Sequence, residues 1–345
     1  MYTVLILILL GLSGWLIYKG AQKKHTGRIA FGVILLVFTW FFFWFMDFWG
    51  EMLWFENLGY NQRFWTVVLS QTAVALAGVV FGGVIVWLLT MKISEEKIWF
   101  KRGARILGAF TGAAWAVSNW EVLLRFWFRV GTETTDPVLG KATSFYLFTL
   151  PFFDRLYELL LLLAIIGAGA VFVSAFLRFE REQVDFDLPQ LDSRSGKAVM
   201  GNLFWDASIL VLVLAFGKYL SRFHLMYSDW GAVRGAGWTD VHIRLPGYLI
   251  AIIIAVLLAV ILLLPSVRSR LGRLFYPKKA AGQMAPLYIF LSAAIVLFGS
   301  WFLFLTAVPG LFQWLRVEPN EITFEKPYII NNIQLTQEGF GLHLI

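Results

Sequence analysis

The sequence predicts an all-α protein, a polytopic transmembrane bundle of about eight helical spans. Hydrophobic residues make up 59% of the 345 residues and charged residues only 15%, with a mean hydropathy of +0.71. These proportions lie well outside the usual range for soluble domains. Apolar runs long enough to cross roughly 30 Å of hydrocarbon as helices recur along the chain. They are continuous, as in "LIAIIIAVLLAVILLLP", and do not alternate as the strands of an outer-membrane barrel do.

The apolar runs give the boundaries of the predicted spans, each uncertain by several residues. Small residues at steps of three and four form smooth stripes in the third and fourth of these spans: Ala75, Gly78 and Gly82, then Gly108, Gly112 and Ala116. Such stripes let helix backbones approach closely in lipid, and we expect packing within the bundle rather than a dimer interface. The spans are 2–18, 29–49, 64–90, 106–128, 151–177, 203–221, 248–265 and 286–308.

Basic residues predict the orientation. The net charge is +7, and most of the Lys and Arg residues fall in four loops, 19–28, 91–105, 178–200 and 266–283. In a membrane protein such loops are typically cytoplasmic, so the charge indicates topology and contact with anionic lipid rather than nucleic acid binding. Eight spans then place both termini outside.

Several function classes are disfavoured by the residues themselves. The chain has no cysteine, which excludes a disulfide framework, a thiolate nucleophile and a Cys-ligated metal. Phosphate-binding, zinc-protease, nucleophile-elbow and dinucleotide-binding motifs are also missing from the sequence. We therefore predict neither a catalytic site nor a cofactor.

Ionisable residues within or near the spans are costly in a membrane and are the default functional candidates. In span 106–128, Glu121 precedes Arg125 by four residues, the favourable order for a helical ion pair; we expect this pair to hold the span to a neighbour. Structural ion pairs near the interface are favoured over a conduction path. The complete set of candidates is Glu121, Arg125, Asp136, Asp154, Asp206, Asp229, Arg234, Asp240, His242 and Arg244.

Two polar segments on the predicted outer side, 129–150 and 222–247, are predicted to form an ordered cap. Asp136-Pro137 begins a turn, and glycines allow the second segment to turn tightly while its tryptophans anchor it at the membrane surface. His224 and His242, with Asp229 and Asp240, could in principle bind a metal, but their spacing favours a hydrogen-bonded interfacial loop. We predict no metal site and expect the cap to serve docking.

Four stretches carry a resemblance to a known family: "WFENLGY", "DPVLGKATSFYLFTLPF", "YSD…GAGWTDVHIRLP" and "EPNEITFEKPYIINNI". The chain resembles the large bacterial membrane proteins of uncharacterised protein family 0182 from about residue 45 onward. One departure is the loop 178–200, which is more acidic than the family pattern. The resemblance implies a multipass plasma-membrane protein in which the last stretch leads into a large extracytoplasmic domain. It implies no particular activity.

The expected organisation is therefore a transmembrane domain over 1–308 and the beginning of an extracytoplasmic segment, the tail, over 309–345. The prolines of the tail predict that it is not one continuous helix, and its few apolar residues must pack on something, for which the cap is the candidate. Arg234 and Arg244 are expected to pair with acids of the tail, Glu318, Glu321 or Glu325. The chain is expected to anchor an extracytoplasmic domain or partner among membrane lipids. The alternative is a transporter or channel for an envelope component such as a lipid.

Overall fold

The computed structural model describes residues 2–93, 98–181, 194–275 and 285–342. Over these residues the chain is helical apart from short connections and one isolated bridge between Thr135 and Ala142. It divides into two compact units, Met1–Thr72 and Ala73–Ile345. In the first unit, α1 (Tyr2–Gln22) and α2 (Thr26–Asn57) pack as an antiparallel hairpin. Helix α3 (Asn61–Leu89) begins in this unit and ends in the second.

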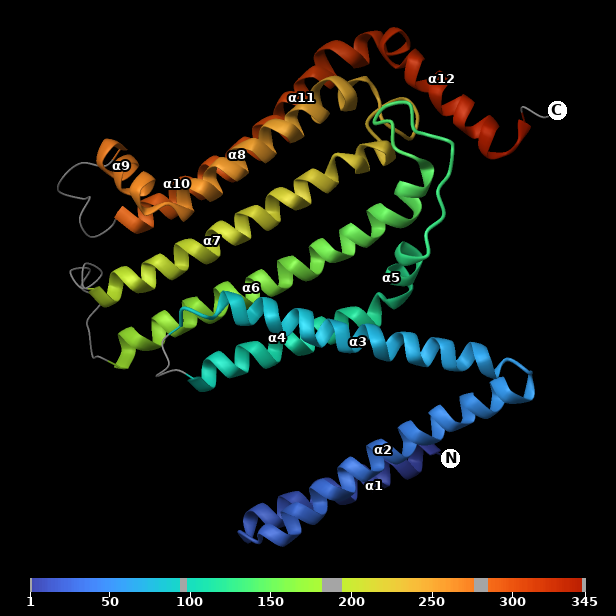
Figure 1. Ribbon diagram of the computed structural model, residues 1–345, viewed down its shortest axis with the longest axis vertical. Helices are drawn as coiled ribbons and strands as arrows, with labels where there is room; N and C mark the ends of the chain where they lie inside the picture. Colours follow the sequence, from blue (N-terminus) through green and yellow to red (C-terminus); the bar gives the residue numbers. More distant parts are fainter. Residues whose placement is uncertain (1, 94–97, 182–193, 276–284, 343–345) are drawn as a thin grey trace. The chain divides into compact units, whose positions relative to one another are not determined.

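The second unit is a row of long helices in contact with their neighbours (Figure 1). Helix α4 packs on α6, α6 on α7, α7 on α8, and α8 on α10. The row consists of α4 (Ile98–Ser118), α5 (Trp120–Trp127), α6 (Leu150–Arg181), α7 (Arg194–Ser221), α8 (Leu245–Leu263), α9 (Pro265–Phe275) and α10 (Ala285–Phe302). The C-terminal ends of α3 and α6 and the N-terminal ends of α4 and α7 lie together with α9 at one end of the row (Figure 1).

Seven helices among the described residues are long and apolar enough to cross a membrane, which confirms the predicted all-α bundle of about eight spans. Large apolar side chains on them remain exposed, such as Phe38, at 60%, and Ile295, at 71%, as lipid-facing positions require. The protein is therefore membrane-embedded. The remaining predicted span, 106–128, is divided at Asn119 into α4 and α5.

Close backbone packing joins α3 to α4. Added Cβ atoms at Gly82 and Gly112 would overlap the carbonyl oxygens of Gly108 and Gly78, respectively. On α4 the buried positions are Lys101, Ala104, Gly108, Gly112 and Ala116, one face of the helix. The small-residue stripes therefore pack within the bundle, as predicted.

The tail is more helical than its prolines predict. After α10 the chain continues through a π turn (Leu303–Ala307), α11 (Val308–Phe312), a second π turn (Gln313–Val317) and a 3₁₀ turn (Glu318–Asn320) into α12 (Glu321–Gly339). Pro327 lies inside α12. The tail is therefore helical for most of its length but is not one continuous α-helix, which agrees with the prediction: π turns precede Pro309 and Pro319, and Asn320, with φ −140° and ψ 44°, interrupts the helical path before α12.

Candidate functional site

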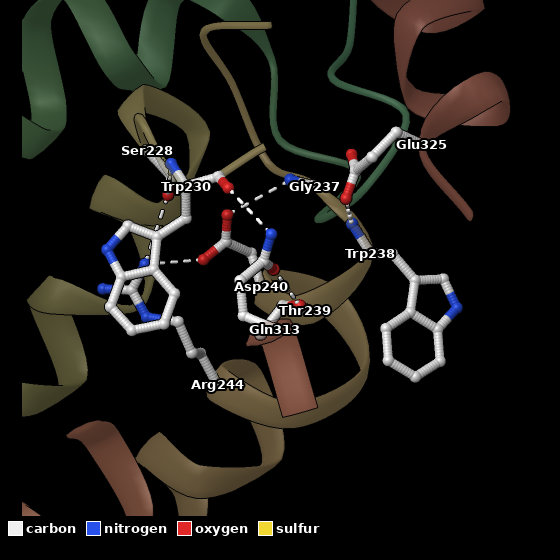
Figure 2. A network of polar contacts seen from close by, with 9 residues as sticks. All are labelled: Ser228, Trp230, Gly237, Trp238, Thr239, Asp240, Arg244, Gln313 and Glu325. Atoms are coloured by element: carbon white, nitrogen blue, oxygen red, sulfur yellow. Dashed lines mark hydrogen bonds and ion pairs between the residues drawn. The ribbon is translucent and has the colours of Figure 1, made fainter. Parts of the chain in front are cut away.

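The candidate site is the cap, residues 129–150 and 222–247, together with the part of the tail that packs on it. Three carboxylates are buried here: Asp136, at 8% exposure, in the first segment, and two where the tail meets the second segment, Asp240 on a π turn (Asp240–Arg244) and Glu325 on α12, at 0% and 1%. Burying a carboxylate without partners costs several kcal/mol, so the contacts of each one define the site. Figure 2 shows Asp240, Glu325 and the groups around them.

Asp240 is bound by charge and by the backbone. Its Oδ1 accepts a hydrogen bond of 2.6 Å from the guanidinium of Arg244, and its Oδ2 accepts one of 3.1 Å from the Gly237 N–H. Arg244 also donates to the Ser228 hydroxyl at 3.2 Å and lies 4.6 Å from the centre of the Trp230 ring. The four-residue spacing of Asp240 and Arg244 brings them together on one helical face. The contacts of Arg244 with Ser228 and Trp230 therefore join the start of the 222–247 segment to its end, and the ion pair with Asp240 holds Arg244 in place.

Glu325 connects the tail to the cap. Its Oε1 accepts a 3.1 Å hydrogen bond from the backbone N–H of Trp238, while its Oε2 has no hydrogen-bond partner among the described residues. Cβ atoms added at Gly231 and Gly237 would lie 3.0 and 2.9 Å from Oε2. The carboxylate therefore fits its site because glycine occupies both positions.

Further contacts extend this junction along the tail. The Thr239 hydroxyl donates to the Gln313 side chain at 2.5 Å, and Gln313 in turn donates to the carbonyl of Trp230 at 3.3 Å (Figure 2). The Asn332 side chain donates to the carbonyl of Arg234 at 2.6 Å. Aromatic contacts add to these: Phe324 lies edge-on to Trp238 with ring centres 5.0 Å apart. The tail thus contacts the 222–247 segment from Gln313 to Asn332.

The expected pairing of cap arginines with tail acids was wrong. Arg234 pairs with Asp229 at 2.9 Å on the surface, a hydrogen bond that raises the pKa of the guanidinium, and Arg244 pairs with Asp240. Each arginine finds an acid a few residues away in its own segment, and Glu325 takes a backbone donor instead.

The other segment of the cap, 129–150, is organised by Asp136. Its carboxylate accepts backbone hydrogen bonds from Val138, Leu139 and Lys141 and one of 2.8 Å from the Tyr146 hydroxyl. The segment ends in a π turn (Phe145–Thr149), and the Phe145 ring lies 4.8 Å from that of Phe223 in the other segment. The two segments are therefore in contact, as the predicted cap requires.

The remaining candidates lie apart from this network. Glu121 and Arg125 form their predicted pair at 2.8 Å, but both side chains lie on α5 and are more than half exposed, so among the described residues the pair does not join α5 to a neighbour. Asp154 at the start of α6 pairs with His224 at 3.0 Å. Asp206 on α7 is buried, and its carboxylate has no hydrogen-bond partner among the described residues.

His242 has a packing role. Its ring stacks on Trp238 with centres 4.6 Å apart and contacts the Tyr328 hydroxyl at 3.4 Å. His224 and His242 thus have separate partners, and the described residues contain no group of three or more His, Cys, Asp or Glu side chains placed to hold a metal ion. Glu325 was expected to contact the cap but through an arginine, and Gln313 was not among the predicted residues, because the partners of both lie more than 70 positions away in the chain.

Fold and site together define a polytopic helical membrane protein whose tail is seated on a polar cap at one end of the bundle. The chain belongs to the uncharacterised protein family UPF0182, whose sequence model matches residues 89–345. It is 31% identical to a UPF0182 protein of Synechococcus sp. (strain JA-3-3Ab) over 86% of this chain and 34% of that protein. It is 29% identical to one of Geobacter sp. (strain M21), over 93% and 36%, and 31% identical to one of Pelobacter propionicus, over 92% and 35%.

The chain thus spans about a third of the length of these curated relatives. No solved structure matches it.

Proposed function

We propose that this chain is an integral membrane domain of the bacterial plasma membrane that anchors and positions an extracytoplasmic domain or partner. The observation that carries the proposal is the seating of the tail on the cap through the buried Glu325. A tail fixed in this way gives whatever follows or binds it a defined position relative to the bilayer. In this proposal both termini and the cap lie on the extracytoplasmic side.

The distribution of contacts supports positioning rather than simple tethering. Hydrogen bonds of Gln313, Glu325 and Asn332 hold the tail at three positions along its length. A rotation of the tail about one of these positions would break the hydrogen bonds at the other two. Losing one of these buried hydrogen bonds and leaving its partner group unpaired would cost about 1–3 kcal/mol.

Paired cysteines test the seating in native membranes, because the chain contains no cysteine of its own. Arg234→Cys with Asn332→Cys is expected to crosslink rapidly on oxidation or with a short bifunctional maleimide, since the two residues are joined by a 2.6 Å hydrogen bond. The control pair, Arg234→Cys with Phe340→Cys, places the second cysteine about 12 Å further along the chain and should react slowly. Equal rates for the two pairs would show that the tail is not seated.

A substitution that disturbs the contact between Glu325 and the cap should slow the crosslink between positions 234 and 332. Gly237→Ala places a Cβ 2.9 Å from Glu325 Oε2, so we expect a loss of about 1–3 kcal/mol in stability and a slower crosslink at 234 and 332. Gly131→Ala is the matched control, because nothing lies within 4 Å of its added Cβ in the same cap. If Gly237→Ala behaves like Gly131→Ala in both measurements, the carboxylate does not hold the tail.

The second candidate function is a transporter or channel for an envelope component such as a lipid. The observation that favours it is Asp206, a carboxylate that is 3% exposed within the bundle and has no hydrogen-bond partner among the described residues. Such groups in membrane helices often mark pathways. Purified protein in liposomes containing fluorescent phospholipid would show lipid transfer between leaflets that Asp206→Asn abolishes, if this candidate is correct. No transfer above that of empty liposomes would exclude it for phospholipids.

A further inference from the structure

A lateral apolar slot lies between α3, α6 and α7 and extends from the C-terminal end of α3 along the middle of α7. Its volume is about 410 Å³, which is within the range of small-molecule binding sites. The walls are aliphatic and include Ile85, Leu88, Leu160, Ala164, Ile209 and Val213. Ala164 is buried at 3% exposure while Leu88 is 47% exposed, so the slot opens from the interior of the bundle toward its surroundings.

The slot is polar at one end only. Lys92 and Trp205 line that end, with the ammonium group 4.1 Å from the centre of the indole ring. The Asn202 side chain donates a 3.1 Å hydrogen bond to the carbonyl of Lys92 and so fixes the lysine backbone beside α7. From Trp205 to Val213 the slot follows α7 for eight residues, about 12 Å. Lys92 is also close enough to Asp206 for their charges to interact.

These features match one kind of ligand. In a bilayer an apolar slot of this size does not hold water, because its walls offer no hydrogen bonds, and an acyl chain can fill it. Lys92, at the end of the slot and within the predicted cytoplasmic loop 91–105, then contacts the headgroup of the lipid to which that acyl chain belongs. Lysine near the surface of an anionic leaflet attracts acidic lipid headgroups.

A second slot repeats this arrangement. It lies between α8, α9 and α10, has a volume of about 310 Å³, and is lined by aliphatic residues together with Ser292 and Arg268. The guanidinium of Arg268 lies 3.9 Å from the centre of the Phe204 ring. In both slots, the one charged residue among the described lining residues is a cation packed on an aromatic ring, and most of the other lining residues are apolar.

We propose that the slot between α3, α6 and α7 binds one anionic phospholipid, with an acyl chain along α7 and the phosphate at Lys92. The proposal is independent of the anchoring role, because no described residue that lines the slot belongs to the cap or to the tail. A bound lipid would fill the space between helices that otherwise meet only in part.

Native mass spectrometry of the purified full chain tests this with phosphatidylglycerol and phosphatidylcholine added at equal concentration. The wild type should retain phosphatidylglycerol preferentially. Lys92→Gln should weaken its retention about fivefold and leave phosphatidylcholine unchanged, because only the charge is removed. Ala164→Phe fills the floor of the slot and should lower the retention of both lipids.

The matched control is Arg102→Gln. Arg102 lies at the same end of the bundle with its guanidinium 5.8 Å from the centre of the Trp99 ring, but it does not line either slot. Its replacement should change retention by less than twofold. An equal loss in Arg102→Gln and Lys92→Gln would overturn the proposal, because it would indicate general attraction to basic residues.

Two further measurements keep the result interpretable. Every variant must still form the crosslink between positions 234 and 332 at the wild-type rate, which reports the folded cap separately from the slot. Dodecanoate added in place of phospholipid distinguishes the possible sources of the acyl chain. If dodecanoate displaces phosphatidylglycerol at equal concentration, the site accepts free fatty acid and the phospholipid assignment fails.

Discussion

Asp136 shows how one side chain can order a whole segment. Its two carboxylate oxygens accept three backbone hydrogen bonds, from residues 138, 139 and 141, and a fourth from the Tyr146 hydroxyl. Backbone N–H groups in a tight turn have no other partners, so the carboxylate replaces hydrogen bonds that a helix or sheet would supply. Gly140, with φ +64°, completes the turn in a conformation that favours glycine.

Replacing this carboxylate should therefore destabilise the cap. We expect Asp136→Ala to lower the free energy of unfolding by about 3 kcal/mol, since several hydrogen bonds to one charged group are lost together. The measurement is thermal or chemical denaturation in detergent. Asp229→Ala is the control, because Asp229 is 69% exposed and pairs only with the exposed Arg234, and its loss should cost less than about 1 kcal/mol. Comparable losses in the two variants would contradict the assigned role of Asp136.

At the scale of single residues, the sequence predicted ion pairs and hydrogen bonds between residues close in the chain, but not those between distant residues. Asp240 and Arg244 are four residues apart, and Asp136 precedes a proline, so their roles follow from spacing and turn chemistry. Glu325 accepts its hydrogen bond from an N–H group 87 positions away, and no pattern in a single chain connects the two. The tail was expected to contact the cap, but the residues that make the contact required the structure.

Among the elements, the π turns follow a common rule. Within the described residues, each of four π turns ends two positions before a proline: 145–149 before Pro151, 240–244 before Pro246, 303–307 before Pro309 and 313–317 before Pro319. Proline lacks an N–H group and its ring clashes with the carbonyl four residues earlier. A wider turn, in which the residue before the proline bonds five residues back, makes room for that ring without ending the helix.

The seam between α3 and α4 gives a prediction at the scale of elements. Gly112→Ala places a methyl group against the carbonyl oxygen of Gly78, so the two backbones must separate, and we expect a loss of at least about 2 kcal/mol in stability. Gly103→Ala, on the same helix with nothing within 4 Å of the added Cβ, is expected to be neutral or slightly stabilising. A Gly112→Ala variant as stable as the wild type would mean that the helices do not meet at this residue.

Element boundaries were predictable where composition changes sharply and not where it stays apolar. The stripes of small residues correctly indicated which faces of α3 and α4 meet. The division between α4 and α5 at Asn119 was not predicted, because the apolar pattern continues past it. The prolines of the tail correctly indicated that it is not one continuous α-helix, but they did not predict how much helix forms between them, because proline is normally taken as the end of a helix and Pro327 lies inside α12.

At the scale of the molecule, the two ends of the second unit differ in what they carry. The cap lies at one end of the helix row, and α9 lies at the other, together with the end of α3 and the start of α4 (Figure 1). This arrangement agrees with the predicted placement of loops 91–105 and 266–283 on one side of the membrane and the cap on the other. Parts of the loops 91–105, 178–200 and 266–283 fall outside the described residues.

Cysteine labelling tests the orientation of this unit. In intact cells, a membrane-impermeant maleimide is expected to label Glu133→Cys in the cap and not Arg270→Cys in α9, because the basic end should face the cytoplasm. Permeabilised cells provide the control, since both positions should then react. Labelling of position 270 from outside would reverse the proposed orientation. Thr26→Cys tests the first unit separately and is expected to be protected.

Composition and the continuous apolar runs were sufficient to predict the class of fold. Chains this apolar are stable in lipid only as helical bundles or closed barrels, and continuous apolar runs favour helices. Composition could not predict how the chain divides. The boundary between the two compact units falls after Thr72, inside α3, and the composition of this helix does not change there.

The seam between α3 and α4 also has a consequence for how the protein is made. Helix α4 carries Lys101, Arg102 and Arg105 near its beginning, and it is not among the helices apolar enough to span a membrane by composition. Lys101 donates to the carbonyl of Ile93, and Arg105 donates to the Thr90 hydroxyl, so two of these cations find their partners just beyond the end of α3. During synthesis, α4 is therefore expected to leave the translocation channel as a hairpin with α3 and to enter the bilayer only together with α3.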